Sequence, residues 1–279
     1  MKKRSSMILL VLMGLGFAFL YIPIFILILY SFNASKLVAV WGGFSTQWYG
    51  KLLEDQGILD AFKNSLQIAI FVAFVSTMLG TIAGYVMARF GRFRGHSAFA
   101  STITAPLVMP EIIDGLAALL LFVSLERLIG WPSGRGMLTI GIAHVTFATA
   151  FVAIIVSSRL RDMDLSIEEA AMDLGATPLK VFFVIVLPII APALISGWLL
   201  SFSLSMDDLV ITSFVAGPGS TTLPMKVFSA ARLGISPKIN AIGSLIVLVA
   251  TIFVISSGVI SSKMEKKRKL EEQQAFEAA

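Results

Sequence analysis

The sequence predicts an all-α polytopic membrane protein with about six transmembrane helices, and three observations lead to that prediction. Hydrophobic residues make up 57% of the 279 residues and charged residues only 14%, whereas a soluble domain is about 45–50% apolar and about 25% charged. The mean hydropathy is +0.88. Uncharged apolar stretches recur along the chain, and several approach the roughly 20 residues that a helix needs to cross a bilayer.

Six stretches meet this requirement, and together they predict one transmembrane domain over residues 1–262. The predicted spans are Met7–Tyr30, Leu66–Met87, Ser97–Val123, Met137–Ser157, Ile189–Met206 and Ile239–Ser262. The first stretch is too long, and too poor in small-residue cleavage signals, for a removed signal peptide. The third contains Pro106 and Pro110, which predict a break near its middle because proline interrupts the backbone hydrogen bonds of a helix.

The distribution of basic residues predicts the orientation of these spans. If the N-terminus is cytoplasmic, inner segments hold 14 of the 22 Lys and Arg residues and outer segments hold 8. Because cytoplasmic loops carry an excess of basic residues, both termini are expected in the cytoplasm, with residues 263–279 forming a charged cytoplasmic tail. The turn-rich segment 206–238 is then an outer loop, expected to contain one short helix. The chain lacks cysteine, which excludes disulfides and thiolate metal sites.

The cytoplasmic segment 161–187, between the fourth and fifth predicted spans, contains the signals of two short helices. Ser166 and Glu169 have the spacing of a capping box, in which each side chain bonds a free backbone N–H of the first turn. Gly175 can adopt the positive φ that ends such a helix. Thr177 and Pro178 suit the N-cap and first position of the next helix. The segment is therefore predicted to form a helix, a turn and a second helix.

The first of these short helices has an apolar face suited to a partner. Ile167, Ala170, Ala171 and Leu174 recur at helical spacing, so they are expected on one side. The small alanine side chains permit a close approach. This face predicts a docking surface of the helix-in-groove kind.

The same segment resembles the EAA signature of binding-protein-dependent importer permeases. The matching residues are Glu169, Ala170, Ala171, Gly175, Ile185, Leu187 and Pro188, with Glu168 directly before them. The resemblance implies the type I ABC importer permease fold and a loop that docks on an ATP-hydrolysing subunit. It also implies an inner-membrane complex of this chain, a second homologous permease, two ATPase subunits and a periplasmic binding protein.

Most of the chain resembles the polyamine permeases in particular, above all the putrescine-type subunit. The segments that carry this resemblance are Tyr30–Lys36, Arg89–Gly95, Thr104–Pro110, Ser205–Val210 and Phe214–Gly219. The resemblance implies ATP-driven import of putrescine, with spermidine or another small solute as the alternative. Which of the two polyamines is carried does not follow from the sequence.

A polyamine pathway needs acceptors for ammonium groups and apolar or aromatic surface for the methylenes. Acids inside apolar spans are costly and usually face a polar interior, which makes four acids and two aromatic residues the candidates for the substrate pathway. These are Glu111, Asp114, Asp207, Asp208, Phe202 and Phe214. Simpler roles remain open: Asp208 also suits a hydrated position at the membrane edge, and Glu111 and Asp114 suit the positive end of a restarted helix. For the two aromatic residues, packing against lipid or a neighbouring helix is the favoured alternative.

Several functional classes lack their sequence signals. The phosphate-cradling pattern G-x-x-x-x-G-K-[ST] does not occur, nor do H-E-x-x-H and G-x-S-x-G, so no catalytic residue, metal site or cofactor is predicted in this chain. ATP and Mg²⁺ are expected in the partner ATPase. His96 and His144 are isolated in the sequence and are predicted to be structural. The competing hypothesis is an ion-gradient-driven transporter or channel, for which an EAA loop has no purpose.

Overall fold

The computed structural model is helical and describes residues 2–37, 40–91, 93–233, 237–249, 251–252 and 255. The chain divides into two compact units, residues 1–56 with 229–279 and residues 57–228. In the part that the structure describes, extended segments pair only at the isolated bridge between Asn33 and Phe44. The all-α prediction is confirmed. The predicted charged tail, 263–279, lies outside the described residues.

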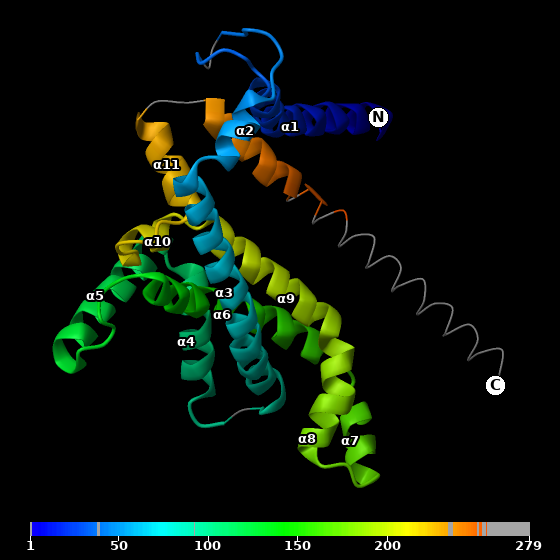
Figure 1. The fold of residues 1–279 in the computed structure, drawn as a ribbon. Coiled ribbons are helices and arrows are strands. Elements are labelled where there is room, and N and C mark those ends of the chain that lie inside the picture. The colour runs from blue at the N-terminus through cyan, green and yellow to red at the C-terminus, as the bar shows by residue number, and fades with distance from the viewer. Residues whose placement is uncertain are drawn as a thin grey trace. The chain divides into compact units, whose positions relative to one another are not determined.

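The helices and their labels follow Figure 1. They are α1 Lys2–Ser31, α2 Gln47–Leu53, α3 Gln56–Arg89, α4 His96–Val108, α5 Glu111–Ile129, α6 Met137–Arg161, α7 Ser166–Asp173, α8 Pro178–Val181, η1 Phe182–Val186, α9 Leu187–Asp207, α10 Val210–Val215, α11 Leu223–Leu233 and an unlabelled helix Pro237–Val249. Among the described residues, four helical stretches are long and apolar enough to cross a membrane: Leu9–Ser31, Gln56–Arg89, Met137–Arg161 and Pro178–Asp207. The bent pair α4–α5 makes a fifth if it is one span. Six spans with both termini in the cytoplasm stay a prediction.

The break predicted in the third span is confirmed. The axes of α4 and α5 differ by 114° across the two residues between them. Met109 is extended, with φ −79° and ψ 141°, because a residue before proline is pushed out of the helical region. Pro110 then precedes α5, so the acids Glu111 and Asp114 fall in the first turn of a new helix.

Helix α6 is the centre of the unit 57–228, because glycines let its neighbours approach closely. A Cβ at Gly80 of α3 would lie 2.5 Å from the Val152 Cβ of α6, and one at Gly84 would lie 2.7 Å from the Ala153 carbonyl oxygen. Gly197 of α9 approaches Val152 as well. Small residues at i and i+4 are the usual means by which membrane helices pack closely.

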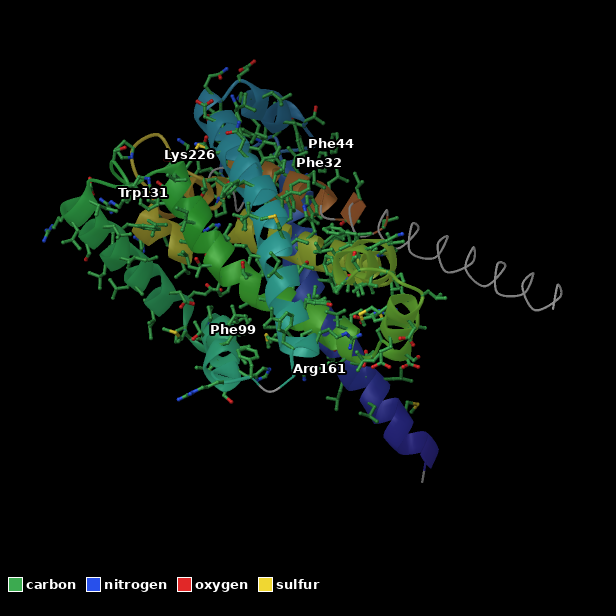
Figure 2. The ribbon with its side chains drawn as sticks, turned by 90° about the horizontal axis from the view of Figure 1, so that it is seen from below. Phe32, Phe44, Phe99, Trp131, Arg161 and Lys226 are labelled. Atoms are coloured by element: carbon green, nitrogen blue, oxygen red, sulfur yellow. The ribbon has the colours of Figure 1, made fainter. Side chains whose placement is uncertain are left out.

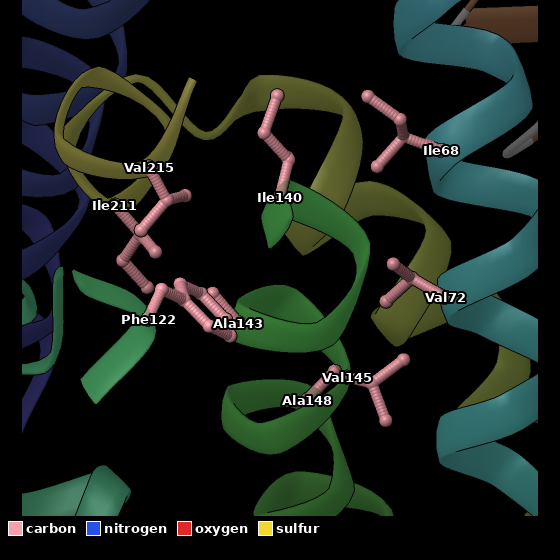
Figure 3. Close-up of a cluster of buried hydrophobic side chains, with 9 residues drawn as sticks. All are labelled: Ile68, Val72, Phe122, Ile140, Ala143, Val145, Ala148, Ile211 and Val215. Carbon is pink, nitrogen blue, oxygen red and sulfur yellow. The ribbon is translucent and has the colours of Figure 1, made fainter. Parts of the chain in front are cut away.

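One buried apolar cluster joins α6 to three other helices (Figure 3). Its members are Ile68, Val72, Phe122, Ile140, Ala143, Val145, Ala148, Ile211 and Val215. Figure 3 shows that they come from α3, α5, α6 and α10. This cluster fixes the middle of α5 and the short helix α10 against α6. A second cluster lies around the other half of α6 and includes Val156, Leu160 and Val181.

The unit formed by 1–56 and 229–279 is organised by Asn33, which is 1% exposed. Its side-chain amide bonds the backbone of Ser35, Val40 and Gly42. Its backbone carbonyl accepts the indole N–H of Trp48 at 2.6 Å. The rings of Phe32 and Phe44 stack beside this node, with centroids 5.3 Å apart (Figure 2).

The predicted outer loop, 206–238, contains more structure than expected. The prediction of one short helix is wrong, since both α10 and α11 lie in this segment. The turn residues Gly217 and Gly219 separate the two helices. The loop between them is fastened to the start of α3, where Asn64 donates to the carbonyls of Gly219 and Thr221, both at 3.1 Å. The Ser65 hydroxyl accepts the backbone N–H of Leu223 at 2.8 Å.

Candidate functional site

The segment 161–187 forms a helix–turn–helix, here called the elbow, in which α7 is followed by α8 and η1. The predicted capping box at its start is wrong. Ser166 is the first residue of α7, and its backbone N–H is bonded by the carboxylate of Asp164 at 3.0 Å. This bond, with a second from the Ser166 hydroxyl, holds the pKa of Asp164 below its usual value. An acid two residues earlier thus performs the role assigned to Ser166 and Glu169.

The end of α7 is as predicted. Gly175 has φ +85°, and its N–H bonds the Met172 carbonyl while the Ala176 N–H bonds the Ala171 carbonyl. These two bonds are those of a Schellman motif, which requires the left-handed conformation that glycine adopts without strain. Thr177 and Pro178 then take the N-cap and first position of α8.

The elbow exposes some of its predicted docking residues and buries others. Glu169 and Ala170 are exposed, and Leu174 is 90% exposed. Ala171 instead packs against the second apolar cluster, as does Ala176. The apolar face of α7 is therefore divided between the interior and the surface.

Glu168, which precedes the EAA match, does not face outward with Glu169. It is 6% exposed, and its Oε1 accepts a charge-assisted hydrogen bond from the Nε of Arg89 at 2.8 Å. Arg89 is the last residue of α3. Because a buried carboxylate needs a partner, the arginine 79 positions earlier explains the orientation of Glu168.

Three further residues of the EAA match follow α8. Ile185 and Leu187 are half-buried and Pro188 is exposed, where the π-helical turn Phe182–Val186 joins α9. A proline inside a helix removes one hydrogen bond and crowds the carbonyl four residues earlier, here Val184. The wider π-turn at this carbonyl relieves the crowding, so α8 continues into α9 as one helical stretch.

The acids of the predicted substrate pathway lie where α9 ends and α5 begins. Glu111 is the first residue of α5 and interacts electrostatically with Asp114 and with Asp207, the last residue of α9. Glu111 and Asp207 are exposed. Asp207 also interacts with Asp208, which follows it directly, so the structure brings the four predicted acids together.

Asp114 borders a groove of about 230 Å³ between α4, α5, α6 and α10. The other lining residues are Pro106, Ala117, Ala118, Leu121, Phe122, Ile142, Ala143, Thr146, Phe147 and Ile211. One carboxylate oxygen of Asp114 is buried and has no hydrogen-bond partner within the described chain. An unsatisfied acid beside an apolar and aromatic wall has the chemistry that one ammonium group and its methylenes require.

Asp208 differs from Glu111, Asp114 and Asp207 because other residues of the protein already hydrogen-bond its carboxylate. Oδ1 accepts the backbone N–H and the hydroxyl of Thr212, each at 2.8 Å, and lies 3.1 Å from the Nε2 of His144. The Nδ1 of His144 lies 2.9 Å from the Ser205 hydroxyl. Asp208 therefore accepts N–H groups of the first turn of α10 and attaches this helix to α6. It is neither a hydrated edge acid nor a free acceptor.

The predicted aromatic residues occupy different surroundings. Phe202 is half-buried on α9 and stacks on Trp198, with centroids 5.6 Å apart. Phe214 is half-buried on α10 and fills the space beside Gly115, where a Cβ would lie 2.7 Å from its ring. Phe214 thus packs α10 against the start of α5.

The structure agrees with the structural role predicted for His144, but its partners could not be read from the sequence. The residue is 3% exposed, and its carboxylate partner lies 64 positions away. A single histidine in an apolar span gives no signal of such a pairing. The elbow and the acids are also separated in space, since α7 and α8 lie at the opposite end of α9 from α10 (Figure 1), and a 21-residue helix is about 30 Å long.

Comparison with solved structures shows the fold class. A chain of the bacterial alginate ABC transporter, in complex with an alginate-bound periplasmic protein, matches with a TM-score of 0.72 and 13% identity, covering 94% of this chain and 96% of that chain. A chain of the MetNI methionine ABC transporter matches with a TM-score of 0.54 and 17% identity, covering 74% and 97%. The fold is that of the membrane chain of a type I ABC importer.

Sequence comparison shows the family. Residues 80–266 match the model of the binding-protein-dependent transport system inner membrane component. The chain is 61% identical over 242 residues to the putrescine transport system permease protein PotI of Escherichia coli K12, covering 87% of this chain and 86% of that protein. It is 38% identical over 241 residues to the spermidine/putrescine permease PotC of the same organism, covering 86% and 89%. The chain therefore belongs to the inner-membrane permeases of binding-protein-dependent ABC transport systems.

Proposed function

We propose that this chain is the permease subunit of an ATP-driven importer for putrescine. The observation that carries the proposal is the 61% identity, over 87% of the chain, to a permease named for putrescine transport. The acids Glu111, Asp114 and Asp207 agree with it, because they are close enough to interact and three neighbouring carboxylates attract a dication.

Energy for transport enters through the elbow. Its exposed residues include Glu169, Ala170 and Leu174, and this surface suits the groove of a partner. The partners are two ATPase subunits that bind ATP and Mg²⁺, a second homologous permease, and a periplasmic protein that delivers the polyamine. This chain hydrolyses no ATP itself.

Transport proceeds by alternating access. Closure of the ATPases moves the elbow, the two permeases separate on the periplasmic side, and the substrate enters at the acids between α5 and α9. One ammonium group is accepted by the free carboxylate of Asp114, and the methylenes lie along Phe122 and Phe147 in the groove. Asp207 and Glu111 attract the dication at the mouth.

Spermidine is the second candidate substrate. It is favoured by the 38% identity to a permease named for both polyamines, and a third ammonium group suits a site with more than two acids. The two substrates share their chemistry, so competition between them is the discriminating measurement.

The test is uptake of radiolabelled putrescine in bacterial cells that lack their own polyamine importers and express the complete complex. Uptake should depend on the ATPase subunit, and unlabelled putrescine should compete better than spermidine. Uptake that continues without the ATPase would instead support a gradient-driven transporter. Stronger competition by spermidine would transfer the proposal to that substrate.

A further inference from the structure

We propose that Arg89 is a positioning residue for energy coupling, which anchors α7 to the end of α3 through the buried carboxylate of Glu168. The inference rests on the proposed docking of the elbow on an ATPase. It adds the route by which movement of the elbow reaches the rest of the protein.

The guanidinium of Arg89 holds the elbow at two points. Its Nε donates to Oε1 of Glu168 at 2.8 Å, and both side chains are 8% exposed. A terminal nitrogen donates to the carbonyl of Met163 at 3.3 Å, in the turn that leads into α7. A planar guanidinium with fixed donor directions constrains both groups more tightly than a lysine ammonium would.

Helix α7 needs such an anchor because, apart from the half-buried Ala171, little else fixes it. It has eight residues, and Glu168 is its one buried residue. A helix of this length is not stable by itself, and it is joined to the chain by a turn before Ser166 and by Gly175 after it. The single side chain that α7 buries is thus a carboxylate aimed at an arginine, although burial of an ion pair is costly compared with burial of an apolar residue.

The last turn of α3 also contacts the other side of the elbow. The ring of Tyr85, one turn before Arg89, meets Phe182 of η1 edge to face with centroids 5.2 Å apart. Ala88 packs on the same apolar cluster as Ala171 and Ala176. The end of α3 therefore contacts both α7 and η1.

The far end of α3 holds the loop that follows α10. Its 34 residues extend over about 50 Å. Near the start of the helix, Asn64 and Ser65 bond the loop that follows α10, through Gly219, Thr221 and Leu223. A displacement of α7 that is passed to Arg89 thus moves one helix whose other end holds the loop that follows α10.

The experiment compares the wild-type complex with Arg89→Gln and Glu168→Gln in proteoliposomes, and the readout is putrescine transported per ATP hydrolysed. Loss of the anchor should lower this ratio about tenfold, a usual size for coupling between sites, while ATP hydrolysis continues. The reversed pair, Arg89→Glu with Glu168→Arg, should recover part of the ratio. The control is Arg94→Gln, which removes an exposed arginine from the segment that follows α3. It should change the ratio by less than about twofold.

An unchanged ratio in both single variants would overturn the proposal, as would a reversed pair no better than the single variants. If the neutral variants do not assemble, Arg89→Lys keeps the charge without the planar fork, and a wild-type ratio in that variant would also overturn it. Ala170→Trp, on the exposed face of α7, separates the two proposals. If it leaves uptake unchanged, the docking role fails; if it abolishes uptake while the Arg89 variants keep the ratio, only the anchor fails.

Discussion

The elbow and the acidic site, formed by Glu111, Asp114, Asp207 and Asp208, differ in how far apart in the sequence the residues that shape them lie. The limits of the elbow's helices are set by neighbours in the sequence: Asp164 bonds the first N–H of α7, Gly175 ends that helix, and Pro178 begins α8. The acidic site is shaped by residues from distant helices, as in the pairing of His144 with Asp208. The comparison teaches that a docking element can be encoded locally, whereas the state of a buried acid depends on packing.

The largest effect is expected from a single backbone position in the elbow. Gly175→Val should reduce putrescine uptake at least about tenfold, because a branched residue is strained at positive φ by about 1–3 kcal/mol and α7 would no longer end there. Binding of putrescine by the periplasmic protein should stay intact. Uptake of labelled putrescine in intact cells measures the effect.

Gly134 provides a matched control for this prediction. It has φ +98°, and a Cβ added at Gly134 or at Gly175 would meet no atom within 4 Å, so Gly134→Val introduces similar strain away from the elbow. Its uptake should fall less than that of Gly175→Val. Equal losses would mean that strain alone, rather than the shape of the elbow, explains the result.

The next effect distinguishes two adjacent acids. Asp207→Asn should lower the rate of putrescine uptake about tenfold, the scale of one lost charge-assisted interaction, and leave the amount of assembled complex unchanged. Asp208→Asn should instead destabilise the complex by about 2 kcal/mol, because it weakens a buried hydrogen-bonded group. Uptake rate and thermal unfolding of the purified complex are measured for both variants.

The opposite pattern would contradict the assignment of these roles. If Asp207→Asn reduces assembly as much as it reduces uptake, Asp207 is structural. If Asp208→Asn unfolds at the wild-type temperature but transports poorly, its carboxylate contacts substrate despite its bonds to Thr212 and His144.

The smallest effect concerns the start of α7. Ser166→Ala should leave uptake within about twofold of wild type, since surface substitutions away from structural features rarely change stability by more than about 0.5 kcal/mol. Asp164→Ala should reduce uptake more, because it removes the carboxylate that accepts the Ser166 N–H. A loss in Ser166→Ala greater than that in Asp164→Ala would restore the capping box predicted from the sequence.

Local chemistry explains what could be predicted from the sequence. Pro110 gave the break between α4 and α5, and Gly175 and Pro178 gave the limits of the elbow, because proline and glycine act through their own backbone geometry. Ser166 was misread because two acceptors compete for the N–H groups of the first turn and Asp164 is better placed. Both residues belong to one short segment, so the error is small.

Contacts between distant residues explain what could not be predicted. Glu168 resembles Glu169 in the sequence, and only Arg89, at the end of another helix, turns it inward. Asp207 and Asp208 are likewise equivalent until His144 is placed beside one of them. The second helix of the segment 206–238 depends on bonds from Asn64 and Ser65, which no local pattern encodes.

The most direct test of the central claim uses the absence of cysteine from this chain. Ala170→Cys places a unique thiol on the exposed face of α7, which can be cross-linked to single cysteines on the ATPase in the assembled complex. We predict a cross-link that forms, changes in yield between the ATP-bound and nucleotide-free states, and abolishes putrescine uptake. If no ATPase position cross-links to this thiol, or if the cross-linked complex transports at the wild-type rate, energy does not enter through the elbow.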